Sequence, residues 1–378
     1  MENVVSILRC DRYDVDRLEL LMERHFEALG GVERYIRPGM RVLLKVNLLM
    51  ARKPEEFTTT HPAFVEALGR VIRRAGGEIV IADSPGGLYS EKILRNTYRV
   101  CGMEAVAERL GAELNFDLGA REMTDENNAL CRTFNFIEPY HRCDLLISVC
   151  KMKTHAMAGF TGAAKNLFGL IPGLEKGEYH FRFPDKKRFC EMLVDLVQTA
   201  KPALSFMDGI TAMQGDGPSS GTAYEAGLTF ASANPYALDL AASYLAGFTL
   251  SETPLTESAV ERGLCPARVE ELEIAGERLS EIALPGYQKP KTASMSLLKM
   301  LPEGMQKKLE KRFAPRPVVR KKRCVGCGLC AESCPVETIR IVEKKAVIDE
   351  QNCIRCFCCQ EMCRIAAIKI KKSRIFRI

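Results

Sequence analysis

Tryptophan is absent from this chain of 378 residues, and histidine is scarce, with only five residues. The chain also has no run of about 18 uncharged apolar residues, so hydropathy gives no transmembrane helix. Its first residues show no basic segment followed by a long apolar one, so we expect no secretory signal. These absences together predict a cytoplasmic protein.

Two nucleotide-binding motifs are also missing. The segment 215–221 resembles Gly-x-Gly-x-x-Gly but contains one residue too many, and no Walker A motif occurs. The sequence therefore supports no organic cofactor such as NAD, a flavin or ATP.

Overall composition is that of a globular protein, but the charge is uneven. Hydrophobic residues make up 47% and charged residues 27%, which argues against wholesale disorder. Residues 316–378 carry 15 Lys and Arg against 6 Asp and Glu, whereas the remainder carries 39 against 42. A basic module of this kind attracts an acidic protein, a nucleic acid or an anionic membrane surface, and charge alone does not choose among them. We expect a redox partner protein, and no motif supports nucleic acid.

Cysteine gives the strongest signal. Nine of the 16 cysteines lie between Cys324 and Cys363, in two runs that share the spacing C-x2-C-x2-C-x3-C. This spacing is typical of bacterial ferredoxins that hold two [4Fe–4S] clusters, in which the fourth cysteine of each run ligates the other cluster. We therefore predict two clusters, one on Cys324, Cys327, Cys330 and Cys363 and the other on Cys353, Cys356, Cys359 and Cys334.

Zinc and disulfide bonds are the alternatives to clusters. Zinc needs only four ligands per site and does not usually show two such runs, and disulfides are disfavoured without a secretion signal. The second run departs from the usual pattern at two positions, because Arg364 replaces proline and Cys358 is an additional thiol. We interpret Cys358 as a bystander, with competition as an alternative ligand left open.

The first 284 residues alternate strands and helices. Apolar runs predict strands at 42–47, 79–83, 144–150, 204–208 and 228–233, and amphipathic patterns predict helices at 62–75, 188–200 and 235–246. This order predicts an α/β fold with a mainly parallel sheet and helices on both faces. Residues 324–378 would form a small α+β ferredoxin-type domain that includes a hairpin turning at 343–345.

Residues 285–323 read as a basic linker that contains several prolines. Its segment 305–313 is basic and amphipathic. We expect this segment to pack on its own protein, with transient contact to a membrane surface or partner as the alternative.

Polar residues gather where the predicted strands end. Lys45 and Asn47 close one strand, Asp83 and Asp208 end two others, residues 151–155 follow a fourth, and Asn234 follows a fifth. Ligands of open α/β sheets bind outside the carboxyl ends of the strands. The sequence therefore predicts a pocket at that edge, although any single position is also compatible with an ordinary turn.

The segment 151–155 contributes two lysines and a histidine that alternate along an extended chain and so share one face. We expect these lysines to be exposed and to bind a small anion, with a solvated surface as the alternative. The anion-site candidates are Lys45, Asn47, Lys151, Lys153, Lys165 and Asn166.

Few residues are candidates for acid–base chemistry. His155 and His180 are the better candidates, because imidazole titrates near neutrality. Asp83 and Asp208 are candidate partners in proton transfer. His25 and His141 are interpreted as structural, and His61 as the cap of the helix that begins at residue 62.

Several of these motifs together resemble the domain-of-unknown-function family 362. The resemblance rests on segments 45–47, 60–62, 83–87, 151–155, 161–169, 208–209 and 215–218, and it spans nearly the whole chain. It implies an iron–sulfur protein with a C-terminal two-cluster domain, from cytoplasmic and often anaerobic settings, and it implies no particular reaction.

The leading hypothesis is an oxidoreductase in which two clusters pass electrons to a substrate or cofactor at the strand ends. The alternative is a non-catalytic electron carrier or a partner in iron–sulfur or metallocofactor assembly. The sequence leaves the substrate and the oligomeric state open.

Overall fold

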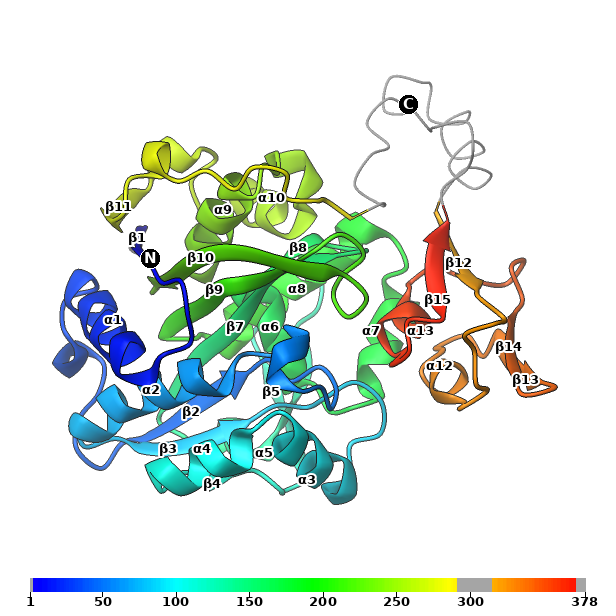
Figure 1. The fold of residues 1–378 in the computed structure, drawn as a ribbon, viewed down its shortest axis with the longest axis horizontal. Coiled ribbons are helices and arrows are strands. Elements are labelled where there is room, and N and C mark those ends of the chain that lie inside the picture. Colours follow the sequence, from blue (N-terminus) through cyan, green and yellow to red (C-terminus); the bar gives the residue numbers. More distant parts are fainter. Residues whose placement is uncertain (1–2, 291–314, 372–378) are drawn as a thin grey trace.

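The computed structural model describes residues 3–290 and 315–371. They form a large α/β body and a small cysteine-rich module, residues 315–371, which lies beside α7 (Glu175–Arg182) of the body (Figure 1). In the described part of the chain, no helix has both the length and the apolar character needed to cross a membrane. The basic segment 305–313 lies outside the described residues.

The body is built on a nine-stranded, mostly parallel sheet. The strand order is β11 (Glu273–Gly276), β1 (Val4–Arg9), β10 (Thr222–Ser232), β9 (Leu204–Gln214), β7 (Leu145–His155), β2 (Arg41–Val46), β3 (Glu78–Ala82) and β4 (Glu113–Leu114), with β8 (Gly159–Thr161) beside β7. Strands β9, β7, β2, β3 and β4 run parallel, β1 and β11 run parallel to each other, and β10 is antiparallel to its neighbours β1 and β9.

Helices cover both faces of this sheet, as the continuous apolar strands predict. Successive side chains point to opposite faces, so Leu44 packs in one core and Leu43 in the other. The Leu44 side carries α1 (Val15–Ala28), α2 (Pro62–Arg74), α3 (Glu91–Val100) and α4 (Met103–Leu110). The Leu43 side carries α6 (Ala163–Asn166), α8 (Lys186–Ala200), α9 (Pro235–Leu245) and α10 (Pro254–Glu261). The ribbon β5 (Ala120–Thr124) and β6 (Thr133–Ile137) and the short α5 (Glu138–His141) complete the body.

The predicted strands and helices are present, and three strands are longer than predicted, among them β10, which begins at Thr222. β7 continues to His155 and β9 continues to Gln214. The expectation that Asn234 joins the other strand ends is wrong. Because β10 is antiparallel to β9, Asn234 lies at the opposite edge, where its side chain accepts hydrogen bonds from the first turn of α9.

The module consists of two small strand pairs and two short helices. Its elements are β12 (Arg316–Val319), α12 (Leu329–Glu332), β13 (Ile339–Val342), β14 (Lys345–Ile348), α13 (Cys358–Glu361) and β15 (Ile368–Lys371). The predicted hairpin is present, with Glu343 and Lys344 at positive φ in a two-residue turn. β12 lies within the segment predicted as linker, and it pairs with β15 of the module.

Candidate active site between the body and the cysteine module

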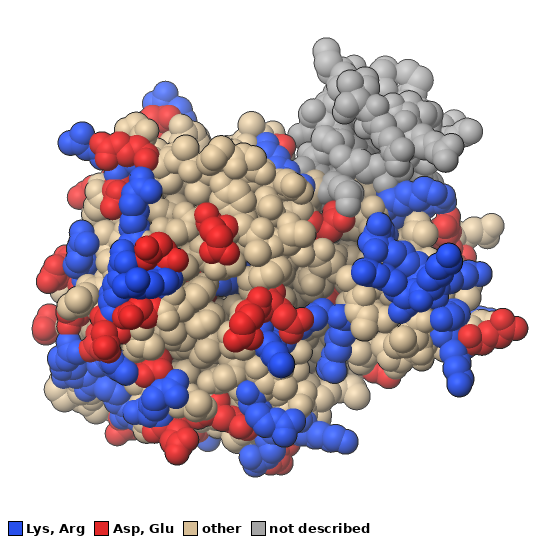
Figure 2. Space-filling model, in the orientation of Figure 1, with Lys and Arg blue, Asp and Glu red and all other residues tan. Residues whose placement is uncertain are grey.

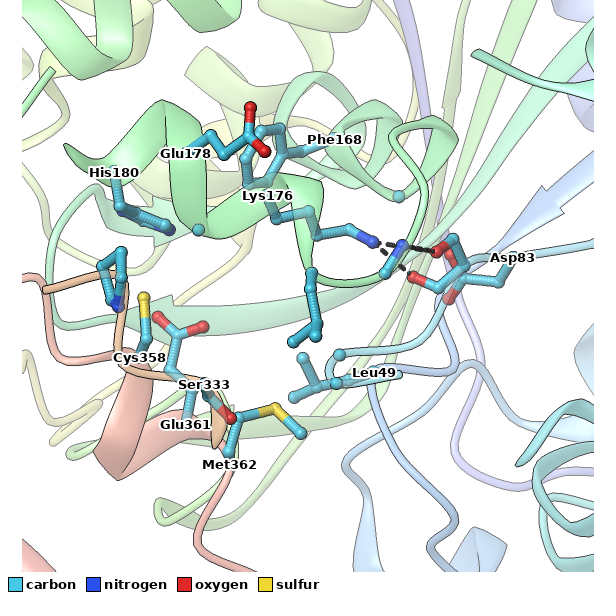
Figure 3. A pocket seen from close by; sticks show the side chains of 18 of the residues that line it. Leu49, Asp83, Phe168, Lys176, Glu178, His180, Ser333, Cys358, Glu361 and Met362 are labelled. Carbon is cyan, nitrogen blue, oxygen red and sulfur yellow. Dashed lines mark hydrogen bonds between the residues drawn. The ribbon is translucent and has the colours of Figure 1, made fainter. Parts of the chain in front are cut away.

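A cavity of about 250 Å³ lies between the carboxyl ends of β2 and β3, the segment from α6 to α7, and the module. We call it the strand-end pocket. The body contributes cationic and polar side chains, and the module contributes Cys334, Cys358 and Glu361. Figure 3 shows Lys176 pointing toward the Asp83 side of the pocket, with His180, Cys358 and Glu361 on the opposite side. The pocket therefore has a cationic end from the body and a cysteine end from the module.

Lys45 and Asp83 form a buried ion pair at the cationic end. Their charged atoms lie 2.8 Å apart, and their side chains are 0% and 3% exposed. The Asp83 carboxylate also accepts a hydrogen bond from the Leu48 amide at 2.6 Å, and Lys45 donates to the Val46 carbonyl at 2.8 Å. Burial lowers the pKa of Lys45, and the neighbouring Asp83 charge opposes that shift. The pair is fixed in place rather than free to capture a ligand.

Lys176 and Lys165 bring two further cations to the pocket, in different environments. Lys176 donates to the carbonyls of Ser84 and Ile171 at 2.8 and 2.7 Å, and burial lowers its pKa to about 7. Lys165 lies over the Phe168 ring at 5.5 Å, and within the described ranges its ammonium makes no hydrogen bond or ion pair. Lys165 is thus the lysine of this pocket that a ligand can engage.

Two of the predicted amides also line the pocket. Asn166 Oδ1 lies 3.2 Å from the Asn47 side-chain nitrogen, and the Asn166 amide donates to the Lys45 carbonyl at 2.8 Å. The structure therefore brings together Lys45, Asn47, Lys165 and Asn166 of the predicted anion site.

Lys151 and Lys153 are not among the residues that line the pocket. The Lys151 ammonium lies 2.8 Å from Asp208 and 2.7 Å from the Tyr13 hydroxyl. Lys153 donates to Asn47 Oδ1 at 2.6 Å and to the Thr58 carbonyl at 2.8 Å, and burial lowers its pKa to about 7.

The expectation that these two lysines are exposed is wrong, because each is no more than 2% exposed. The end of β7 extends beyond β2 and pairs with β8 and β9, and its lysines are held by side chains and carbonyls of other segments. The register of the pairing with β9 shifts between Lys151, opposite Asp208, and Lys153, opposite Met213, which further separates their environments.

The two predicted acid–base histidines occupy different positions. His180 lines the pocket and stacks on Phe189 with ring centres 4.3 Å apart. His155 is buried beside the pocket, where its Nδ1 accepts from the Met157 and Ala158 amides and its Nε2 lies 3.0 Å from the Glu361 carboxylate. Burial lowers the pKa of His155 to about 4 and that of His180 to about 3, so both are neutral at pH 7.

The two predicted carboxylates separate in the same way. Asp83 lines the pocket, whereas Asp208 does not. Asp208 lies in a second polar group, where it accepts from Lys151, from the Tyr13 hydroxyl at 2.9 Å and from the His61 amide at 3.1 Å.

The module places four cysteines of the two runs around one small cavity. Cys324, Cys327, Cys330 and Cys363 line it, which is the combination expected when the fourth cysteine comes from the other run. Burial raises the pKa of the Cys359 thiol, and the neighbouring thiols of Cys356, Cys353, Cys330 and Cys334 raise it further. In the described residues, no three His, Cys, Asp or Glu side chains are grouped to hold a single metal ion.

Backbone amides approach the sulfur atoms of both groups. Amides donate to Cys324 at 3.3 Å and Cys363 at 3.1 Å, and to Cys334 and Cys353 at 3.4 Å each. Such donors stabilise thiolates and tune cluster potentials. Gly326 has a positive φ, and a Cβ there would lie 2.6 Å from the Lys344 backbone, so only glycine fits this turn. The donor set and the close backbone fit iron–sulfur clusters.

Direct contacts hold the module against the body. Gln360 donates to the Asp216 carbonyl at 3.0 Å, and the Ser219 hydroxyl donates to the Glu361 carbonyl at 2.7 Å. Sequence reasoning missed Glu361 as a pocket residue. Its position among the cysteines of the second run was visible, but the contact with His155 joins segments about 200 residues apart and leaves no local pattern.

Comparison with known proteins gives two family matches. Residues 42–244 match the domain of unknown function DUF362, and residues 316–364 match the 4Fe-4S dicluster domain. A thylakoid-associated protein of Synechocystis sp. is 31% identical over 298 residues, which cover 75% of this chain and 90% of that protein.

One solved structure with a related arrangement is the lactate racemase apoprotein from Thermoanaerobacterium thermosaccharolyticum. It is 13% identical with a TM-score of 0.38, and the match covers 64% of this chain and 57% of that chain. At this level of similarity we draw no argument from it.

Proposed function

The chain belongs to the domain-of-unknown-function family 362 and carries a 4Fe–4S dicluster domain, and on this premise we propose that it is an oxidoreductase acting on a small organic anion. The observation that carries the proposal is the shared lining of the strand-end pocket. Lys165 of the body and Cys334 of the module line the same cavity, so an anion held by the body lies beside the cysteine module.

The module would hold two [4Fe–4S] clusters, which when bound supply single electrons at low potential. One cluster belongs to Cys324, Cys327, Cys330 and Cys363, and the other to Cys353, Cys356, Cys359 and Cys334. The second group is the one that reaches the pocket, through Cys334.

The body's residues bind and orient the ligand. The Lys165 ammonium has no hydrogen-bond or ion-pair partner among the described residues and is available to a carboxylate or phosphate, and the Asn47 amide also lines the pocket. Lys176 adds positive charge beside Lys165 in its protonated form, whereas the charge of Lys45 is matched by Asp83. Leu49, Phe168 and Met362 add apolar surface that excludes water around the anion.

His180 is the proposed proton carrier of the pocket. Its ring is 4% exposed, and Nδ1 has no hydrogen-bond partner within the described residues. At pH 7 the ring is neutral, so its free nitrogen would accept a proton during the reaction rather than hold one beforehand. His155 lies behind Glu361 and is proposed as a positioning residue, because its Nε2 reaches the pocket only through that carboxylate.

The test is ligand-dependent oxidation of the reduced holoprotein under anaerobic conditions. Small organic anions are added to protein with reduced clusters, and cluster absorbance is followed. We expect one class of anion to oxidise the wild type and the Lys187→Met control, in which an exposed lysine on α8 is lost, but to act far more weakly on Lys165→Met.

A set of anions that leaves the cluster spectrum unchanged, together with a stable complex with another oxidoreductase, would favour the alternative of a carrier or assembly partner. The cytoplasmic location predicted from the sequence stays a prediction.

A further inference from the structure

The module has an outer end that is separate from the end facing the strand-end pocket. Cys327 is exposed, whereas Cys356 and Cys359 are buried. The small cavity lined by Cys327 and its three companions is bordered by Val325, Ile341 and Ile365, which are 62%, 39% and 41% exposed. Apolar side chains that surround an exposed cysteine are not needed for the packing of the module itself.

A row of cations lies next to this apolar border. Lys321, Lys322 and Arg323 are consecutive and exposed, and no ion pair to them is present within the described ranges. Lys344 is also exposed, and its backbone packs against Gly326 between Val325 and Cys327. Figure 2 shows Lys and Arg side chains gathered on the module, with few acidic ones among them. We call this surface the outer face; it comprises Lys321, Lys322, Arg323, Val325, Cys327, Ile341, Lys344 and Ile365.

We propose that the outer face docks a small acidic protein that carries one electron. The inference rests on the proposed function, because it supplies the electrons that the pocket would use. Apolar side chains at the centre with charges around them are the usual anatomy of a protein interface, and complementary charge speeds encounter. A nucleic acid would use the cations but would leave the apolar border around Cys327 without a role. A lipid surface would bury both the cations and the apolar border, but it exchanges no electron with the module.

The exchange at this face moves one electron and no atoms. The carrier is oxidised by one electron and the module is reduced by one. The two ends of the module then have different tasks: Cys327 lies at the surface where the carrier docks, and Cys334 lies in the wall of the strand-end pocket.

The test uses the anaerobic holoprotein and an acidic [2Fe–2S] ferredoxin as the probe. The dissociation constant and the rate of module reduction are measured over a range of ionic strength. We expect Lys321→Glu/Lys322→Glu to weaken binding and slow reduction by about tenfold or more at low salt, and to flatten the salt dependence. The matched control, Arg24→Glu/Arg37→Glu, makes the same charge change on exposed residues of the α1 end of the body and should change both by less than about twofold.

A separate variant tests the apolar border. Val325→Ser should weaken binding at high salt, where the charge contribution is screened. Iron content and reduction by a small-molecule reductant are measured for every variant, so that loss of the clusters is not mistaken for loss of docking.

Equal effects of the two double variants would overturn the proposal, as would binding to anionic lipid vesicles or nucleic acid with no binding of the ferredoxin. Failure here is distinguishable from failure of the proposed function. Anion-dependent oxidation of chemically reduced protein reports on the pocket alone, whereas ferredoxin binding reports on the outer face alone.

Discussion

Two lysines of the strand-end pocket should respond in opposite ways to the same substitution. Lys165 faces the cavity without an ion pair among the described residues, whereas Lys45 is bound to Asp83 at 2.8 Å with both side chains buried. Replacing either one by methionine keeps length and apolar bulk but removes the charge. We expect Lys165→Met to lose affinity and Lys45→Met to lose stability.

The expected changes in anion affinity and in the free energy of unfolding depend on the interactions that each substitution removes. A hydrogen bond to a charged group is worth about 1.5–3 kcal/mol, so Lys165→Met should weaken anion binding roughly 10- to 150-fold. Its effect on the free energy of unfolding should be below about 1 kcal/mol, because the relieved repulsion from Lys45 and Lys176 offsets the lost attraction to Glu361. Lys45→Met instead leaves Asp83 buried without its partner, which costs about 3–5 kcal/mol.

The assay is a pair of measurements on each variant. Sulfate affinity is measured by isothermal titration, and stability by thermal unfolding, where 1 kcal/mol shifts the melting temperature by roughly 2–4 °C in a body of this size. The reasoning is refuted if Lys165→Met lowers the melting temperature as much as Lys45→Met, or if it leaves sulfate affinity within about twofold of the wild type.

Three further predictions concern the clusters, the body and acid stability. Anaerobic reconstitution should give about eight irons and eight sulfides per chain. The iron content should be unchanged in Cys358→Ser and about half as large in Cys356→Ser. About four irons per chain in the wild type, or stoichiometric zinc, would contradict two clusters. A chain ending at Pro290 should unfold cooperatively when followed by circular dichroism. It retains Tyr287, whose hydroxyl donates to the Met213 carbonyl at 2.8 Å. A broad transition would show that the module completes the core of the body. Burial lowers the pKa of His25 to about 3, so between about pH 6.5 and 3 the unfolded chain binds one more proton than the folded chain. The free energy of unfolding therefore falls by about 1.4 kcal/mol for each pH unit of acidification in that window. Denaturant titrations of His25→Gln should show a shallower acid dependence than the wild type, and an identical slope would assign the acid sensitivity to other groups.

Local patterns predicted the elements of the body well. The helix that begins at Pro62 is present, and the His61 side chain accepts a hydrogen bond from the Ala63 amide as the predicted cap. The direction of a strand is not a local property, however. The sequence around Asn234 resembles any strand-to-helix turn, and only the pairing of β10 with β1 and β9 places it at the wrong edge for the pocket.

Burial was the second property that local reading misjudged. Lys151 and Lys153 alternate along β7 as predicted, but their surroundings come from distant parts of the chain. Tyr13 and Asp208 hold the Lys151 ammonium, and Asn47 and the Thr58 carbonyl hold that of Lys153. The exposure of a charged side chain on a strand therefore depends on segments that the local pattern does not contain.

The sequence predicted the residues on each side of the pocket, but not that the two sides lie together. Lys165 was a candidate from the cationic segment and Cys334 from the ferredoxin-type run, yet they are 169 residues apart and no pattern joins them. Their proximity comes from contacts such as Gln360 to the Asp216 carbonyl.

Asp216 belongs to the glycine-rich segment 215–221, which does not match the nucleotide-binding motif. In the structure this segment contacts α13 of the module. Its glycines serve close packing there, since a Cβ at Gly217 would lie 2.2 Å from the Thr154 carbonyl. Replacing Gly217 would therefore disturb the contact between segment 215–221 and the module before it affected ligand binding. The segment that resembled a nucleotide-binding motif thus determines whether the body and the module together form the pocket.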